Sequence, residues 1–231
     1  MDNTELNRLT REIKISKDQI LREEAEMWFL SMLAESEIGA KVIFYGGTAL
    51  RLAYGSPRFS EDIDLIKIKP LKFKDFESFI KKVAGKSNGR WRIQDLKAKR
   101  QTFFALFLID EEKLKHKFSL KIELHMSDKR VSIESQLALI KSPTSIFEPL
   151  LLVPTIRELK KLKEETIVAR KKARDIFDLW YIAQVNREPL SLPLPRGIYT
   201  EREFKNELQV FLPPKFYPII KQLYEQTKRT D

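Results

Sequence analysis

The run Lys41-Val42-Ile43-Phe44-Tyr45-Gly46-Gly47-Thr48 decides how the first half of this chain folds. Its apolar residues stop at two glycines, which predicts a buried strand over residues 41–45 that enters a tight turn. Residues 48–54 then have helical spacing and end at Gly55, a typical C-cap of a helix. A second strand is expected over residues 62–68, so the order here is strand, turn, helix, strand.

The turn and the second strand carry the residue types of a phosphate and metal site. Backbone N–H groups are unpaired where a helix begins, and Gly46 and Gly47 let an anion approach closely beside Thr48. Asp62 and Asp64 are two residues apart, so both side chains lie on one face of the strand. These carboxylates repel each other unless a divalent cation binds between them. An anion site beside paired carboxylates is what transfer from a nucleoside triphosphate needs.

A later strand supplies a candidate for a third carboxylate. Residues 119–126 alternate between apolar side chains on one face and Lys121, Glu123 and His125 on the other. Glu123, at the centre of the polar face, is the candidate for a third metal ligand, and the alternative is a surface glutamate paired with Lys121. The chain has no cysteine and two histidines, so a metal must rest mainly on carboxylates, which favours Mg²⁺ or Mn²⁺.

Hydrophobic spacing divides the chain into two parts. We expect residues 1–150 to hold a helix followed by mixed strands and helices, and residues 151–231 to be helical, which gives an α+β fold. Further strands are expected over 91–96, 102–109 and 119–126, and helices over 16–34, 73–85 and 155–184, from 200, and near 217–226. The proline-containing stretch 186–199 predicts a loop.

The composition of the chain limits the classes of partner that it can bind. The 231 residues carry 43 Lys and Arg against 33 Asp and Glu, a net charge of +10, which favours a nucleic acid, a nucleotide or an acidic membrane surface. The longest apolar run, residues 103–109, is far shorter than the roughly 20 residues that cross a bilayer. The N-terminus shows no signal-peptide pattern, so we expect a soluble, cytoplasmic protein. No Gly-x-x-x-x-Gly-Lys-Ser/Thr run is present, which excludes a P-loop kinase.

The helical part contains a dense patch of charges. Asp175 and Asp178 are three residues apart and so lie nearly on one helix face. Arg174 and Asp178 could equally form an ordinary i,i+4 pair on a solvated helix.

Lys163 stands out within this patch. It lies four residues from Leu159 and from Ile167, on the stripe that should face inward. A buried lysine is costly unless it meets an anion, so we expect Lys163, rather than Lys160 or Lys161, to face the nucleotide.

Two blocks of sequence resemble a known family. The first is Phe44–Leu52 (FYGGTALRL), then Tyr54-Gly55, Arg58 and Ser60–Leu65 (SEDIDL), which resembles the AbiEii-type nucleotidyltransferase toxins of the DNA polymerase β-like superfamily. The second is Lys163, then Arg170, then Arg174–Leu179 (RDIFDL), which resembles the family's late Lys and its Arg-Asp-x-x-Asp-Leu motif. Together the blocks span about residues 40–182.

The resemblance implies a small mixed sheet flanked by helices, with a helical C-terminal half closing a nucleotide cleft. It implies Mg²⁺ at Asp62 and Asp64, an NTP substrate, and a role as the toxin of a toxin–antitoxin or phage-defence pair. Some members of the family add nucleotides to the 3′ end of tRNA. The remaining implied site residues are Gly47, Thr48, Arg58 and Ser60 along the triphosphate, Lys163 at nucleotide phosphates, Asp175 needed for activity, and Asp178 fixing its helix.

One departure concerns the late Lys. Family members usually have small and apolar residues after it, whereas Glu164, Glu165 and Thr166 follow Lys163 here, so Lys160 or Lys161 are alternative counterparts.

Three functions fit these observations. The first is a metal-dependent nucleotidyltransferase acting on RNA, which suits the net charge because Lys and Arg contact phosphates irrespective of sequence. The second is a nucleotide- or RNA-binding module without turnover, against which the intact Asp62, Asp64 and Lys163 argue. The third transfers a nucleotide to a small molecule such as an antibiotic hydroxyl, and the basic charge argues weakly against it because such substrates are cationic.

Overall fold

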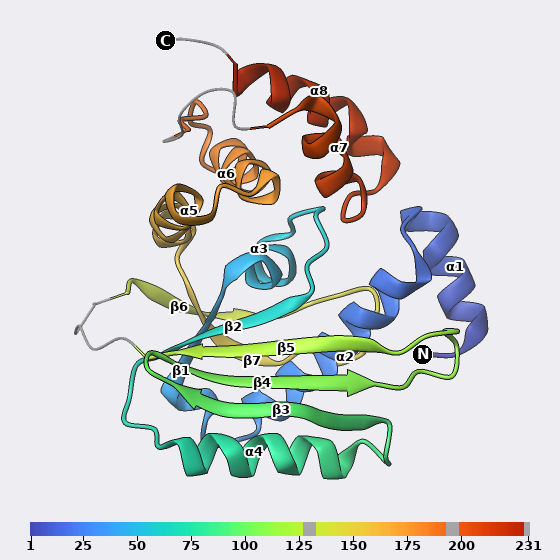
Figure 1. Cartoon of the computed structure of the whole chain (residues 1–231), viewed down its shortest axis with the longest axis vertical. Helices are drawn as coiled ribbons and strands as arrows, with labels where there is room; N and C mark the ends of the chain where they lie inside the picture. The colour runs from blue at the N-terminus through green and yellow to red at the C-terminus, as the bar shows by residue number, and fades with distance from the viewer. Residues whose placement is uncertain (127–132, 193–198, 229–231) are drawn as a thin grey trace.

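Five strands form the sheet that carries the predicted carboxylates (Figure 1). The computed structural model describes residues 1–126, 133–192 and 199–228. The strands are β1 (Val42–Tyr45), β2 (Asp62–Lys67), β3 (Trp91–Lys99), β4 (Thr102–Ile109) and β5 (Phe118–His125), in the order β1-β2-β5-β4-β3. Only β2 and β5 pair in parallel within this sheet. The predicted strands and the mixed α+β class are therefore confirmed.

The parallel pairing sets the register of the polar side chains. Asp64 lies opposite Glu123, and Asp62 lies opposite Lys121. Because side chains alternate along each strand, all four of these residues lie on one face of the sheet.

Two helices cover the other face of the sheet. They are α2 (Lys17–Ala34) and α4 (Phe73–Lys86). Phe29 of α2 packs edge-on against Phe107 of β4, and Phe76 of α4 packs against Phe103. The hydroxyl of Ser16 accepts a hydrogen bond from the N–H of Gln19, which is the predicted start of α2.

Several elements lie outside the sequence prediction. The first helix, α1 (Asn3–Ile13), is capped by the Asp2 side chain. A separate two-stranded sheet joins β6 (Ser135–Leu139) to β7 (Leu150–Pro154). A short 3₁₀ turn, η1 (Gly39–Lys41), precedes β1.

The helix after β1 starts earlier than expected. It is α3 (Gly46–Tyr54), so the two glycines form its first turn rather than preceding it. Leu50 of α3 packs with Leu159 and Ile182 from the C-terminal helices.

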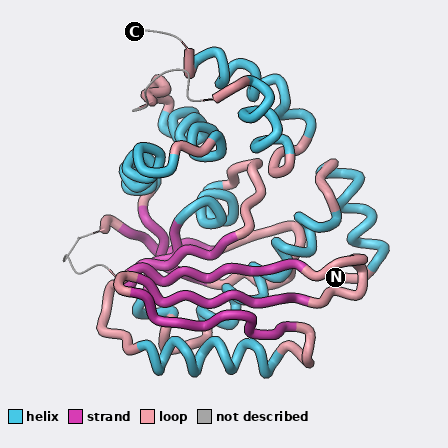
Figure 2. Tube along the Cα trace, in the orientation of Figure 1, coloured by secondary structure: helices cyan, strands magenta, loops and turns pink. Residues whose placement is uncertain are grey.

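The C-terminal part is helical, as Figure 2 shows in cyan. The expected helix over residues 155–184 is two helices, because Lys171 adopts a left-handed conformation with φ of 47°. The helices are α5 (Ile156–Arg170), α6 (Ala173–Asn186), α7 (Glu201–Gln209) and α8 (Tyr217–Gln226), with a 3₁₀ turn η2 (Pro214–Phe216) before α8. Part of the predicted loop 186–199 lies outside the described residues. The division at residue 150 stays a prediction, although α6, α7 and α8 share a hydrophobic cluster of their own.

None of the described helices is long and apolar enough to cross a membrane.

Candidate functional site

The glycine turn packs directly against the predicted site residues. Gly46 has φ of +86°, and a Cβ built on it would collide with Oδ2 of Asp64. A Cβ on Gly47 would collide with the guanidinium of Arg58 and lie 2.9 Å from Oγ of Ser60. The absence of side chains therefore lets the start of α3 approach the carboxylate strand closely. Thr48 is fully buried, and its hydroxyl donates a hydrogen bond to the carbonyl of Asp62.

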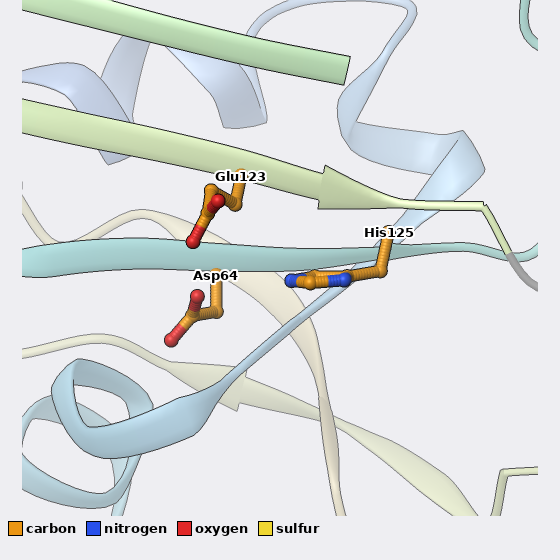
Figure 3. A group of neighbouring side chains, drawn as sticks. All are labelled: Asp64, Glu123 and His125. Carbon is orange, nitrogen blue, oxygen red and sulfur yellow. The ribbon is translucent and has the colours of Figure 1, made fainter. Parts of the chain in front are cut away.

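Asp64, Glu123 and His125 form a possible cation site. Each offers one ligand atom, and these atoms all lie within 4.8 Å of one another. Figure 3 shows the two carboxylates and the imidazole pointing toward one another from β2 and β5. Two carboxylate oxygens and one imidazole nitrogen are a donor set that can hold a divalent cation. Glu123 has the face that the alternation of its strand predicts, and the pairing of β2 with β5 places it beside Asp64.

Asp62 is held by a lysine in this structure. Nζ of Lys121 lies 3.1 Å from Oδ2 of Asp62 and 3.0 Å from Oε2 of Glu123. Glu123 therefore makes the pair with Lys121 that the alternative interpretation expects and also approaches Asp64, and its role as a metal ligand stays a prediction. Burial alone lowers the pKa of Lys121, but the charges of Asp62 and Glu123 outweigh this and raise it.

The carboxylate of Asp64 is partly buried and desolvated. Burial, together with the nearby charge of Asp62, raises its pKa. A cation bound beside Asp64 would offset this effect, because its positive charge stabilises the ionised carboxylate.

His125 was not among the residues predicted for the site. The signal was present in the sequence, since His125 lies two residues after Glu123 and therefore on the same strand face. Its ring packs edge-on against Tyr45, with the ring centroids 6.0 Å apart.

A network of ion pairs links α5 and α6. Nζ of Lys163 lies 3.1 Å from Asp175 and 2.6 Å from Asp178. Arg170 donates two hydrogen bonds of 2.8 Å to Asp175. Burial alone would raise the pKa of Asp175, but Arg170 and Lys163 outweigh it and hold the pKa at about 2.

Lys163 has the inward orientation that its helical position predicts. Its side chain is 6% exposed, whereas that of Lys161 is 66% exposed and pairs with Glu158. Lys160 pairs with Glu188. The anions that Lys163 meets in this structure are Asp175 and Asp178, and its contact with a nucleotide stays a prediction.

Arg58 is more deeply buried than expected for a residue that contacts the triphosphate. It is 2% exposed and donates hydrogen bonds of 2.7 and 2.8 Å to Asp178. It also bonds to the carbonyl of Phe59. The structure thus brings Gly47, Arg58 and Ser60 together, but directs the Arg58 guanidinium toward α6.

A cavity of about 200 Å³ separates the sheet from α5. Asp64, Glu123 and His125 line one wall, and Lys163 and Arg170 line the other. Gly46 also reaches this cavity, while the other predicted residues, Gly47, Thr48, Arg58, Ser60, Asp62 and Asp175, lie outside its lining. The arrangement places negative and positive groups across a space that can receive a phosphate with its cation.

Comparison with known proteins identifies one family and two similar structures. The model of a family described as nucleotidyl transferase AbiEii toxin, type IV toxin–antitoxin system, matches residues 28–230. A structure from H. pylori assigned as a nucleotidyltransferase has a TM-score of 0.55 and 20% identity, covering 94% of this chain and 85% of its own. JHP933 from Helicobacter pylori has a TM-score of 0.56 and 17% identity, covering 92% and 94% respectively. At these identities the likeness to the two structures concerns the fold alone. No curated protein matches the chain.

Proposed function

Because the chain belongs to the AbiEii nucleotidyltransferase toxin family and is a nucleotidyltransferase, we propose that it transfers a nucleoside monophosphate from an NTP to the 3′ end of an RNA, tRNA being the first candidate. In this proposal the transfer depends on a divalent cation, Mg²⁺ or Mn²⁺, and disables the RNA. The protein acts as the toxin of its pair in the cytoplasm, and a cognate antitoxin counters it.

One observation carries the proposal. The carboxylates of Asp64 and Glu123 face Lys163 and Arg170 across the cavity of about 200 Å³. A triphosphate needs both kinds of group, because its oxygens bind cationic side chains and also share a metal with carboxylates. The start of α3 at Gly46 opens onto the same cavity and offers backbone N–H groups.

The reaction is a substitution at the α-phosphorus. A bond forms between the 3′ oxygen of the acceptor and the α-phosphorus, and the bond from that phosphorus to the bridging oxygen breaks. Pyrophosphate leaves, and the hydroxyl proton is released to solvent. Lys163 and Arg170 hold the triphosphate in place and compensate its charge, while Gly46 and Gly47 let it approach the helix start.

Asp62, Asp64 and Glu123 hold the cation in this proposal, and His125 joins them. Bound there, the cation would neutralise charge on the phosphate oxygens. Lys121 occupies part of this acidic site through its contacts with Asp62 and Glu123, so its ammonium must move when the cation binds. Asp175 and Asp178 act through Lys163 and Arg58, which they keep in position.

An RNA acceptor is supported by charge. The net charge of +10 gives affinity for a polyanion without any base contact. A cationic antibiotic would be repelled by the same charge.

The test is label transfer. The purified protein is incubated with each α-labelled NTP and total RNA, with Mg²⁺, with Mn²⁺ or with a chelator, and Asp64→Asn serves as the matched inactive variant. We expect label in an RNA band only with the wild type and a cation. Label confined to protein or to a small molecule would overturn the RNA acceptor, and transfer in excess chelator would overturn the cation.

A further inference from the structure

The face of the sheet opposite to α2 and α4 carries a row of partly exposed side chains on β4. Phe103, Ala105 and Phe107 are buried beneath α2 and α4, and the alternate residues Thr102, Phe104, Leu106 and Leu108 point the other way. Figure 1 shows α2 passing behind these strands, and none of the described helices crosses in front of β3, β4 and β5. An aromatic ring on this face is therefore open to a partner.

Phe104 is the neighbour of the acidic site on this face. The registers of the strands place Asp64 opposite Glu123, Glu123 opposite Phe104, and Phe104 opposite Lys97. These four side chains form one row across β2, β5, β4 and β3. The ring of Phe104 thus lies one strand away from the carboxylates that hold the cation in the proposed function.

Two lysines of β3 flank this ring. Nζ of Lys99 lies 4.1 Å from the centre of the Phe104 ring and 3.9 Å from Oε1 of Glu123. Nζ of Lys97 lies 5.3 Å from the same centre and also pairs with Asp95. The side chains of Lys97 and Lys99 are 51% and 46% exposed, so both can also reach a solvent-borne anion.

We propose that Phe104, Lys97 and Lys99 form an acceptor platform, on which the single-stranded 3′ end of the RNA lies during transfer. The inference rests on the proposed function and names the surface that the acceptor uses. Lys99 covers the ring of Phe104 in this structure, so its ammonium moves aside when a base stacks there. Stacking does not depend on the identity of the base, and the displaced lysine and Lys97 contact the phosphates on either side of it. Both contacts suit a strand end whose bases are unpaired.

The position of the platform agrees with the geometry of the reaction. The nucleotide cavity lies on the side of β1 and α5, where Tyr45 and Lys163 line it. The platform lies on β4 and β3, on the other side of Glu123. A phosphoryl transfer needs the attacking oxygen and the leaving group roughly in line, on opposite sides of the phosphorus. An acceptor on the platform approaches from the side opposite to the cavity.

Charge favours RNA over a protein partner on this surface. A protein interface is typically depleted of lysine at its centre, whereas stacking rings beside lysines are typical of surfaces that bind single-stranded nucleic acids. The acidic groups nearby, Glu123 and Asp95, already have lysine partners.

The experiment separates acceptor binding from nucleotide binding. We would measure KM for the RNA, KM for the NTP and kcat, together with the affinity for a labelled single-stranded RNA oligonucleotide as salt is varied. The variants are Phe104→Leu, which removes the aromatic face, Phe104→Tyr, which keeps it, and Lys97→Ala. Lys82→Ala is the control, since Lys82 is exposed on α4, beyond the opposite face of the sheet.

We expect Phe104→Leu to raise KM for RNA roughly tenfold and to leave KM for NTP unchanged, with Phe104→Tyr close to the wild type. Lys97→Ala should weaken oligonucleotide binding and reduce the salt slope of log K by about 0.7, the loss of one phosphate contact. Lys82→Ala should do neither. An unchanged KM for RNA in Phe104→Leu, or a change confined to KM for NTP, would overturn the platform.

Failure of the proposed function gives a different result. If the wild type labels no RNA, the assignment of RNA as acceptor fails. The measurement of oligonucleotide binding still tests whether the platform binds single-stranded RNA. Weaker binding by Phe104→Leu and Lys97→Ala then supports a single-stranded nucleic acid surface, and unchanged binding by both refutes it.

Discussion

Arg58 and Asp178 stand 120 positions apart in the chain and form a two-point ion pair that is almost wholly buried. The pair joins the segment before β2 to α6, so it connects the sheet to the helical part. Nζ of Lys163 contacts the same carboxylate. Arg58 and Lys163 together compensate a charge that burial would otherwise make unfavourable.

Loss of this ion pair should destabilise the protein. Arg58→Ala removes one partner and leaves the Asp178 carboxylate buried, so we expect unfolding to become easier by about 3–5 kcal/mol. Arg58→Lys should recover only part of this, because an ammonium cannot form the two parallel hydrogen bonds. Chemical denaturation measures the difference, and Arg8→Ala, which breaks exposed pairs with Glu5 and Glu12, should leave the midpoint unchanged. A midpoint for Arg58→Ala equal to that of the wild type would contradict the role of the pair.

Removal of the strand carboxylates should abolish transfer and preserve the fold. Asp62→Asn and Asp64→Asn keep the size of the side chain and remove the charge that holds the cation, so activity should fall more than about 100-fold. Stability should not fall in Asp64→Asn, because its carboxylate is buried beside Asp62 and the substitution removes that repulsion. Label transfer and thermal denaturation report the two properties separately. Full activity in either variant would show that the cation is held elsewhere.

Lys163 should matter for nucleotide binding, and Lys161 should not. Lys163 lines the cavity, whereas Lys161 is exposed and pairs with Glu158 on its own helix. We expect Lys163→Ala to weaken NTP binding at least tenfold, since a full charge near the phosphates is lost. Titration of both variants with a fluorescent NTP is the measurement. Weaker binding by Lys161→Ala alone would favour the alternative counterpart of the family's Lys.

The glycine turn should tolerate no side chain. Gly46→Ala forces a Cβ into Asp64 at a positive φ, and Gly47→Ala forces one into Arg58, so each should destabilise the protein by more than about 1 kcal/mol. Gly85→Ala is the matched control, because nothing lies within 4 Å of a Cβ there. Gly85 lies inside α4, so its replacement should stabilise by about 0.5–1 kcal/mol. Equal stabilities of the three variants, measured by chemical denaturation, would show that the turn accommodates the added methyl group.

Asp175 should make stability depend on pH in the acid range. Its pKa falls from 3.8 to about 2 on folding, because Arg170 and Lys163 favour the charged form despite burial. A pKa lowered on folding stabilises the protein above the unfolded value and loses that contribution as the pH falls through the folded value. The contribution is about 2 kcal/mol, present above pH 4 and lost toward pH 2. Asp175→Asn should therefore be less stable than the wild type at pH 7 and nearly equal near pH 2. If the free energies of unfolding of the wild type and Asp175→Asn differ by the same amount at every pH, this linkage is contradicted.

Local patterns predicted most of the fold. Ser16 and Thr200 stand where the sequence predicts helices to begin, and each accepts an N-capping hydrogen bond. The alternation predicted for residues 119–126 is present in the burial of the side chains of β5. What the sequence did not reveal depends on contacts between distant segments. Strand β7 lies between the helical part and β1, and its partner β6 is short and mostly exposed, so neither has a pattern of its own. Lys171 breaks the long helix with no glycine or proline to mark the place.

The candidate site shows the same difference between local patterns and long-range contacts. Alternation within each strand indicated which faces Asp64 and Glu123 occupy, but their adjacency depends on the parallel pairing of β2 and β5, which no local pattern encodes. The burial of Arg58 likewise depends on a carboxylate far along the chain. Short-range periodicity therefore predicted orientation, and tertiary pairing decided the contacts.

The candidate site depends on the pairing of β2 with β5 and on the Arg58–Asp178 pair. These contacts therefore determine the order in which parts of the site can form during synthesis. A chain emerging from the ribosome presents Asp64 well before Glu123 and His125, and the carboxylate for Arg58 only when α6 appears. Until then the two halves lack the buried pair that joins them, and Lys163 and Arg170 of α5 lack the Asp175 and Asp178 carboxylates that hold them. Prematurely terminated chains that end before α6 are thus expected to be inactive, because the basic groups at the cavity are not yet held in position.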